Sequence, residues 1–378
     1  MKLIDAHPAV GLSRGAVEVK QGESKLAGQY PNPEFEASFG QGSAHDGSDQ
    51  ALVWGLELSI PLEWAAKRHY ASKAAKSSID AAVHEAEAVR QEVILELKLQ
   101  FIRIAYDKAR LDSLEDFLEQ LDSLVGILGL REEKGGSAAV ELDRIEIQAM
   151  ETRQRIEEAK VLAAVHRAQL DLWLGGKLPE DYEVDLEIAQ LPELPGWEKA
   201  VFLLESGHPK IKAAKKNLEA ASYDVKAQKH EAFPHIEVGG FYESGLDAYN
   251  YGAMLKITLP LWNWNLGAVA KSSAEKKVAA GELESTVTGL LAAFIEAHGL
   301  ASQKREAALA YQSSIVPKAQ KTAGILEKMY ASGDAKLIDV LDGRRCLLET
   351  KMEYLSILQK FHAACAKLEN LIGEVDDE

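Results

Sequence analysis

The sequence predicts a mainly α-helical fold with a β-barrel portion. Very long coiled-coil helices would form an α-barrel, and each chain would add four transmembrane β-strands. Three observations carry this prediction. The chain is an internal duplication, proline is absent between Pro61 and Pro179, and each repeat contains two short segments in which apolar and polar residues alternate. Four strands cannot close a membrane barrel, whereas three chains would supply twelve.

Composition excludes several classes of protein. The chain has 378 residues and a net charge of −16, which argues against nucleic acid as a partner because phosphate binding needs clustered Lys and Arg. Unbroken apolar runs are only a few residues long, so we expect no transmembrane helix. Cys346 and Cys365 both lie in segments with a helical pattern, so we expect neither a disulfide framework nor a zinc site. We also expect no cofactor.

The duplication divides the chain into a first repeat at 1–176, a connector at 177–196 and a second repeat at 197–378. Landmarks of the first repeat recur in order, with an offset that falls from 201 to 198 residues. These are His7-Pro8 with His208-Pro209, Pro33 with Pro234, Pro61 with Pro260, Gly135 with Gly333, and Leu170 with Leu368.

The two repeats differ at their beginnings. A helix-like lead-in, residues 197–205, precedes His208-Pro209, but the first repeat starts only six residues before His7-Pro8. The residues after Met1 lack the apolar core and cleavage site of a signal peptide. We therefore expect that the chain is truncated at its start and that a signal peptide has been lost.

Each repeat is predicted to read helix, strand, strand, long helix, turn, helix, and its two strands form a β-hairpin. Period-two alternation places strands at about 33–40 and 51–61, and again at about 234–243 and 250–261. Polar loops rich in Gly, Ser and Asp join the two strands of each pair. Trp54, Trp64, Trp262 and Trp264 lie in or just after the second strands, which fits either an aromatic girdle at a membrane interface or ordinary packing at a sheet–helix junction.

Long helices follow each hairpin. Leucine and valine at positions 111, 114, 118, 121, 125 and 128 step by three and four, which is the spacing of a coiled-coil seam. We expect helices at about 63–133 and 137–173, then at about 266–330 and up to 372, with a kink or discontinuity at Pro317. The helices alone would also fit a soluble coiled-coil structural or adaptor-like scaffold.

The ordered set of segments resembles the TolC-type outer-membrane efflux family over nearly the whole chain. The resemblance lies in the duplicated helix–hairpin–helix order, the Pro33-Glu34-Phe35 strand start, the passage from Ile60 to Arg68, and the segments Tyr330–Gly333 and Leu337–Asp342. The heavy-metal cation branch, the CzcC/CusC-like proteins, is the most similar. Ala65-Ala66-Lys67-Arg68 departs from the Gly-Gly-Lys-Arg form common in that branch, and no amino-terminal lipid-anchor cysteine is present.

This resemblance implies a homotrimer with a 12-stranded barrel in the lipid of the bacterial outer membrane and a helical tunnel in the periplasm. It also implies a periplasmic adaptor (membrane fusion) protein and an energised inner-membrane efflux pump as partners. The channel would be a passive export conduit for metal cations or small toxic compounds. It would not be an enzyme, and the sequence has no phosphate-binding loop or nucleophile elbow.

Asp339 and Asp342 lie three residues apart on one helix face and resemble the family's constricting aspartates at the periplasmic entrance. Crowded carboxylates from three copies would attract cations. The alternative is a solvated helix start, where acidic residues favour the helix dipole.

Two further groups of residues are expected to work in the channel. The helix–turn–helix tips would contact the adaptor, although glycine can simply end a helix. The polar strand face would line the pore. The tip residues are Gly135, Gly136, Ser332 and Gly333, and the pore residues are Glu57, Glu237, Lys256 and Thr258.

Overall fold

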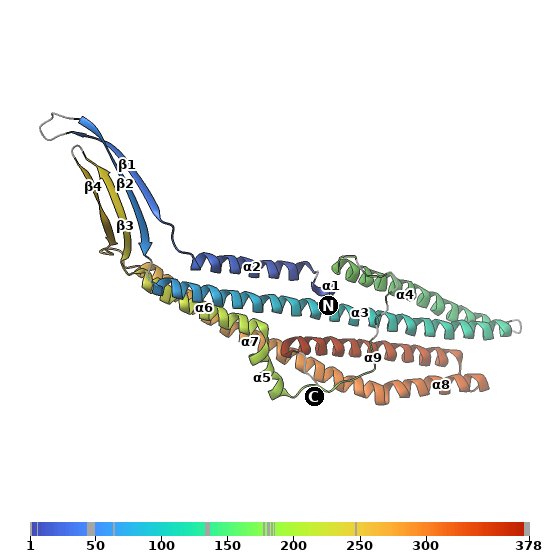
Figure 1. The fold of residues 1–378 in the computed structure, drawn as a ribbon. Coiled ribbons are helices and arrows are strands. Elements are labelled where there is room, and N and C mark those ends of the chain that lie inside the picture. Colours follow the sequence, from blue (N-terminus) through green and yellow to red (C-terminus); the bar gives the residue numbers. More distant parts are fainter. Residues whose placement is uncertain are drawn as a thin grey trace. The chain divides into compact units, whose positions relative to one another are not determined.

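A computed structural model shows a mainly helical chain with one β-sheet (Figure 1). The structure describes residues 2–5, 7–43, 50–62, 65–132, 137–176, 178–179, 182, 184, 186–245 and 248–373. The elements are α1 Lys2–Asp5, α2 Pro8–Gly28, β1 Glu34–Ser43, β2 Gln50–Leu62, α3 Ala65–Glu132, α4 Ser137–Trp173, α5 Trp197–Gly207, α6 Pro209–Glu231, β3 His235–Ser244, β4 Tyr249–Thr258, α7 Leu266–Ala310, the π-helix η1 Tyr311–Ile315, α8 Val316–Ser332 and α9 Leu337–Ile372.

The chain folds into two compact units, and each unit takes segments from both repeats. One unit contains residues 12–88 and 209–288, which hold the sheet and the helical segments that adjoin it. The other contains residues 1–11, 89–208 and 289–378 and is helical in the part that the structure describes. The predicted order of hairpin, long helix and second helix is present in both repeats.

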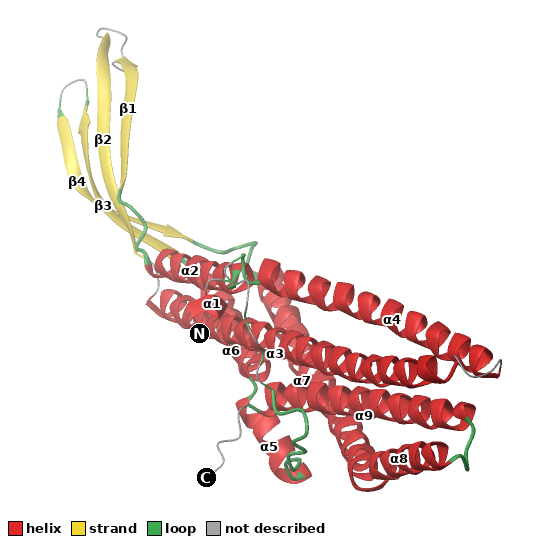
Figure 2. Ribbon diagram, turned by 90° about the vertical axis from the view of Figure 1, so that its right-hand side faces the viewer, coloured by secondary structure: helices red, strands yellow, loops and turns green. Residues whose placement is uncertain are grey.

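The sheet has four antiparallel strands in the order β1-β2-β3-β4 (Figure 2). Within each hairpin the strands pair continuously, for example Glu36 with Glu57 and Glu237 with Lys256. The central seam joins β2 to β3 and therefore joins the two repeats. Because successive side chains alternate between faces, this register gives the sheet one polar and one apolar face.

Helical segments of the same unit support the sheet where its strands end. Lys67 at the start of α3 forms an ion pair with Glu231 at the end of α6, with Nζ and Oε2 2.6 Å apart. The ring of Tyr70 stacks on His230 at 5.3 Å between centroids. Asn265, with φ of 56°, donates from Nδ2 to the Gln228 carbonyl oxygen at 2.9 Å and holds the passage from β4 to α7 against α6.

The core of the helical unit confirms the predicted coiled-coil seam of α3. Leu114 and Leu121 are buried, and Leu111, Leu118 and Val125 pack against them. Residues of α4 and α9 complete this cluster, so the apolar positions of the seam are shared with helices of both repeats: Ile145, Ala149, Ile156, Leu337, Val340, Leu341 and Leu348.

Polar contacts join α3 to α4 and join α9 to α3 and α8. Arg344 of α9, whose side chain is largely buried, pairs with Glu327 of α8 at 2.9 Å and donates from Nη1 to the Gln120 carbonyl of α3 at 2.6 Å. Asp107 of α3 lies 2.5 Å from Nδ1 of His166 of α4. Removing one partner of such a contact would leave a largely buried charge without compensation, which is destabilising.

The connector lies against the same helical unit. The Ile188 carbonyl oxygen lies 3.3 Å from Nε2 of His362 on α9, and Arg305 of α7 donates from Nε to the Pro192 carbonyl oxygen at 3.1 Å. Burial lowers the pKa of His362 below its usual value, and the hydrogen bond to Ile188 only partly opposes this effect.

The expected discontinuity at Pro317 is present. The helix widens into η1 before α8 begins, and Pro317 occupies the first turn of α8. Proline has no N–H to give to the preceding turn, and a π segment is a usual way for a helix to absorb the missing hydrogen bond. The Val316 N–H bonds to the Tyr311 carbonyl, five residues back.

One continuous helical stretch, Leu266–Ser332, is long and apolar enough by length and composition to cross a membrane. Its best 18-residue window has a mean hydropathy of 1.4, and 6% of that window is buried. The expectation of no such helix considered only unbroken apolar runs, whereas a window average tolerates scattered polar residues. A single helix that passes this test is weak evidence for a membrane span.

Candidate functional site

The polar face of the sheet brings the expected pore residues together. Glu57, Glu237, Lys256 and Thr258 all lie on this face by register. Lys256 donates from Nζ to Oε2 of Glu237 at 3.1 Å. The same face carries more polar side chains that were not singled out from the sequence, although the period-two alternation contained the signal: Glu34, Glu36, Ser38, Ser59, His235, Glu243 and Asn250.

The polar face is therefore predominantly acidic, with five glutamates against one lysine and one histidine among the described strand residues. An excess of carboxylates on one sheet face makes the local electrostatic potential negative and attracts cations. An aromatic ring interrupts this surface, because Phe241 lies over Gly252, where a Cβ atom would meet the ring at 2.9 Å. Such a ring covers backbone that glycine leaves bare.

The opposite face of the sheet is apolar and aromatic. Phe35 and Phe39 of β1, Leu58 of β2 and Leu255 of β4 are all exposed on it. Trp54 packs on Tyr242 on the same face, with ring centroids 5.5 Å apart. Isolated exposed apolar residues are ordinary, but a whole exposed sheet face of this kind marks a surface that contacts lipid or another protein.

Tryptophans lie where the second hairpin meets the helices. Trp262 is 92% exposed and Trp264 is 56% exposed, directly after β4. The first hairpin has two tryptophans in the corresponding region: Trp54 lies inside β2, and Trp64 falls outside the described residues. The exposure of Trp262 fits the girdle interpretation, whereas Trp264 lines a pocket with Phe233 and Leu259 where α6 meets the hairpin, which fits packing at the sheet–helix junction.

The tip between α8 and α9 is a compact glycine turn. Gly333 has φ of 88°, a left-handed conformation that favours glycine, and it ends α8. The Asp334 N–H donates to the Met329 carbonyl at 2.8 Å, and the Ser332 hydroxyl donates to Asp334 at 2.7 Å. The tip residues of the first repeat, Gly135 and Gly136, lie outside the described residues.

Asp339 and Asp342 are both exposed at the start of α9, but their contacts differ. Asp339 accepts the backbone N–H of Lys336 through Oδ2 at 3.0 Å, which caps the helix. Asp342 forms an exposed ion pair with Arg345 at 3.4 Å. The capping role agrees with the helix-start alternative for Asp339, whereas Asp342 has no such structural duty.

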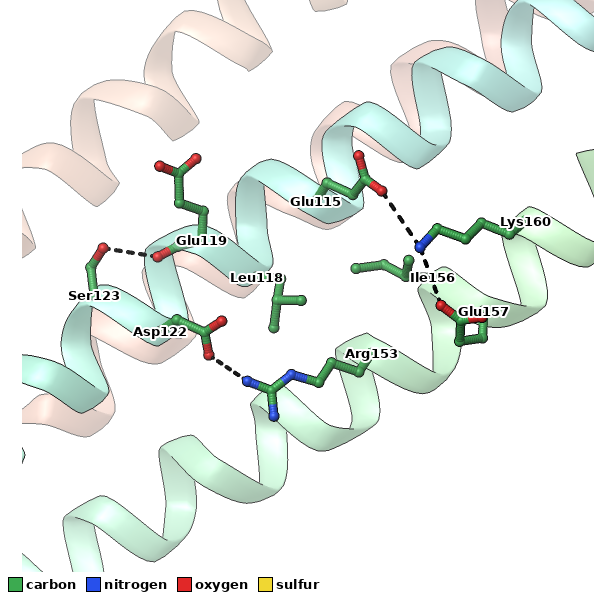
Figure 3. Close-up of a pocket in the computed structure, with 9 residues that line it drawn as sticks. All are labelled: Glu115, Leu118, Glu119, Asp122, Ser123, Arg153, Ile156, Glu157 and Lys160. Atoms are coloured by element: carbon green, nitrogen blue, oxygen red, sulfur yellow. Dashed lines mark hydrogen bonds and ion pairs between the residues drawn. The ribbon is translucent and has the colours of Figure 1, made fainter.

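A groove of about 660 Å³ between α3 and α4 adds a feature that the sequence analysis did not identify (Figure 3). Leu118 and Ile156 lie between charged rims. Asp122 pairs with Arg153 at 2.8 Å, and Lys160 bridges Glu157 at 3.2 Å and Glu115 at 3.9 Å. Charged residues between the seam positions of α3 were the available signal. An apolar floor with charged rims suits a helix with a matching stripe.

The described residues contain no cluster of three or more His, Cys, Asp or Glu side chains placed to hold a metal ion. Burial raises the pKa of the Cys365 thiol to about 12, so it remains a neutral thiol at physiological pH. Cys346 is exposed on α9.

Comparison with protein families decides the relationship. Residues 203–374 match the family described as outer membrane efflux protein. The chain carries an outer membrane efflux protein domain. The matched residues include α6, the second hairpin formed by β3 and β4, and all of the helices that follow it, from α7 to α9. The resemblance that the sequence motifs indicated is thereby confirmed.

Curated relatives of this chain include a metal-resistance protein, an outer membrane lipoprotein and a solvent-efflux protein. The cobalt-zinc-cadmium resistance protein CzcC of Cupriavidus metallidurans is 21% identical over 376 residues, which cover 96% of this chain and 86% of that protein. The probable outer membrane lipoprotein SilC of Salmonella typhimurium is 23% identical over 329 residues, covering 80% and 68%. The toluene efflux pump outer membrane protein TtgI of Pseudomonas putida is 25% identical over 235 residues, covering 56% and 48%.

Solved structures share the fold of this chain along its length. The structure of CusC superposes with a TM-score of 0.82 at 19% identity, covering 99% of this chain and 91% of that one. VceC of Vibrio cholerae, an outer membrane protein, superposes with a TM-score of 0.77 at 17% identity, covering 98% and 94%. The predicted fold class, long helices with a β-barrel portion, is confirmed by these channels.

Proposed function

We propose that this chain is the outer-membrane channel of a tripartite efflux system. Three copies close one 12-stranded barrel, and their long helices continue as a tunnel into the periplasm. The observation that carries this proposal is the four-stranded sheet, which has one polar face, one apolar face and a free edge at β1 and at β4. Strands of ten or more residues are long enough to cross a bilayer.

The free edges explain why a single copy is incomplete. Unpaired backbone groups are not tolerated in hydrocarbon, so the edges of β1 and β4 require strands from other copies. Head-to-tail pairing around one axis closes a ring without leaving an edge. In this arrangement the apolar face contacts outer-membrane lipid and the acidic face lines the pore.

The channel conducts passively, and a partner inner-membrane pump supplies the energy through a periplasmic adaptor. The adaptor contacts the helix–turn–helix tips that include Ser332 and Gly333. A helix of the adaptor with an apolar stripe packs along the groove between α3 and α4, whose rims offer both signs of charge. Reversing one rim charge with Arg153→Glu would weaken adaptor binding, whereas Arg155→Glu, at an exposed position of the same helix outside the groove lining, would leave it unchanged.

Asp339 and Asp342 form the periplasmic constriction of the proposed channel. Removing both carboxylates with Asp339→Ala and Asp342→Ala raises single-channel conductance and weakens block by divalent cations, because the ring of carboxylates both narrows the entrance and binds the ions. Unchanged conductance and unchanged block in a planar bilayer would remove both residues from the gate.

Metal cations are the cargo that the polar face suits best, and small toxic compounds are the second class. The face carries an excess of carboxylates, and the match to the cobalt-zinc-cadmium resistance protein CzcC covers 96% of this chain, whereas the match to the toluene efflux protein covers 56% of it. Acidic side chains concentrate cations in a pore without binding them tightly, which a conduit requires.

Planar-bilayer recording of the purified trimer tests the function. A salt gradient across the bilayer should give a reversal potential of the sign expected for cation selectivity, and Glu57→Gln should reduce it. A channel that prefers anions, or a protein that stays soluble without detergent and forms no pores, would contradict the proposal. The second result would favour a soluble scaffold.

A further inference from the structure

The internal duplication relates the two hairpins residue by residue. Adding 201 to a residue of β1 gives its counterpart in β3, and adding 199 to a residue of β2 gives its counterpart in β4. These offsets convert the observed pair Glu36–Glu57 into the observed pair Glu237–Lys256. The pairs at both ends of the hairpins are related in the same way: Glu34–Ser59 with His235–Thr258, and Gly42–Ala51 with Glu243–Asn250.

The seam between β2 and β3 has a counterpart that a single chain cannot form. In this seam the second strand of the first repeat pairs with the first strand of the second repeat. The free edges belong to β4, the second strand of the second repeat, and to β1, the first strand of the first repeat. When copies form a ring, β4 of one copy therefore meets β1 of the next as β2 meets β3.

We propose that β4 pairs with β1 of the neighbouring copy in the register that the duplication transfers from the β2–β3 seam. The proposal rests on the proposed function, because it requires that copies close one barrel. The offsets convert the observed pair Ser59–Gly239 into Thr258 opposite Ser38 of the next copy. The nine pairs of this seam are Ala253 with Ser43, Met254 with Gly42, Leu255 with Gln41, Lys256 with Gly40, Ile257 with Phe39, Thr258 with Ser38, Leu259 with Ala37, Pro260 with Glu36, and Leu261 with Phe35.

The side chains of this register are compatible with the two faces. Ile257 and Phe39, which are 46% and 74% exposed in the single chain, meet on the apolar face. Lys256 faces Gly40 of the next copy, which leaves its ammonium free to keep its bond to Glu237. A slip of one residue would move every β1 side chain to the opposite face and place phenylalanine among the glutamates.

One position distinguishes the two seams. Gly239 lies so close to β2 that a Cβ atom there would approach the Leu58 carbonyl oxygen to 2.3 Å. Its counterpart in β1 is Ser38, which has a side chain. The seam between copies must therefore be wider than the β2–β3 seam at this point, and the pair Thr258–Ser38 is the most demanding place to test the register.

Disulfide trapping tests the register directly. In a background where Cys346 and Cys365 are replaced by serine, Ser38→Cys is combined with either Thr258→Cys or Met254→Cys. Met254 lies on the same face of β4 but four residues away, about 13 Å along the strand, which is beyond the reach of a disulfide. On mild oxidation in membranes, the first variant should give covalent dimers and trimers at least ten times more than the second.

A second pair on the apolar face, Ala37→Cys with Leu259→Cys, should cross-link as well, so the result does not depend on the wider point. A cross-link between Ser38→Cys and Met254→Cys, or heat-sensitive trimers in which neither predicted pair cross-links, would overturn the register without contradicting the proposed trimeric barrel. Monomers in detergent with no cross-link in any variant would overturn the register and the proposed function together.

Discussion

The two aspartates at the start of α9 should respond differently to substitution, because only one of them caps the helix. Asp339 accepts the Lys336 N–H at 3.0 Å, and Asp342 pairs with Arg345 at 3.4 Å with its side chain 59% exposed. The hydrogen bond from the N-cap N–H to a carboxylate at N3 is worth about 0.5–1.5 kcal/mol, and a carboxylate in the first turn gains about 0.3–1 kcal/mol from the helix dipole. An exposed ion pair contributes about 0.2–1 kcal/mol, and often nothing measurable.

Asp339→Ala should therefore increase amide hydrogen exchange in the first turn of α9 by about 5- to 30-fold, the factor that about 1–2 kcal/mol gives. Asp342→Ala should change exchange there by less than about 5-fold. Mass-spectrometric exchange on peptides that contain Leu337 to Leu341 measures this difference. Single-channel conductance recorded on the same variants then distinguishes the effect of each aspartate on helix capping from its effect on the proposed constriction. Equal protection losses in the two variants, or no loss in Asp339→Ala, would refute the capping argument.

Three further substitutions test other parts of the structure. Burial lowers the pKa of His362, so on acidification the unfolded chain takes up the proton before the folded chain does. The free energy of unfolding is therefore highest above about pH 6.5 and falls at lower pH by at most about 1.4 kcal/mol per pH unit. His362→Gln should reduce this pH dependence in urea denaturation between pH 7.5 and 5, and an unchanged pH dependence would refute the assignment. Gly239→Ala should lower the melting temperature of the assembly, whereas Gly240→Ala, with its nearest contact at 3.5 Å, should not, and equal effects would contradict the close approach. Arg344→Ala should cost about 2–4 kcal/mol and the exposed Arg345→Ala less than about 1, as measured by chemical denaturation; similar costs would show that the buried contacts of Arg344 do not matter.

Much of the fold could be predicted because it depends on local periodicity. The alternation of polar and apolar residues over β1 to β4 predicted which residues share a face of the sheet. The steps of four and three residues from Leu114 through Leu118 to Leu121 predicted the buried seam of α3. Pro317 located the discontinuity because proline lacks the donor that a regular helix needs. Each of these signals is contained within a few neighbouring residues.

Features that depend on long-range pairing could not be predicted. The pair Asp107–His166 joins residues 59 positions apart, and Arg344 reaches a carbonyl 224 positions away. No local pattern specifies such partners. The groove between α3 and α4 also arises only when two helices meet, and the difference between Asp339 and Asp342 depends on the hydrogen bond that one carboxylate makes to Lys336.

Native mass spectrometry of the detergent-extracted protein tests the central claim most directly, because the claim is that several copies complete one barrel. The account predicts a single species of three chains, three times the 41.3 kDa of one chain, which dissociates on heating. A stable monomer or dimer under the same conditions, with the edges of β1 and β4 protected from hydrogen exchange within one chain, would contradict it.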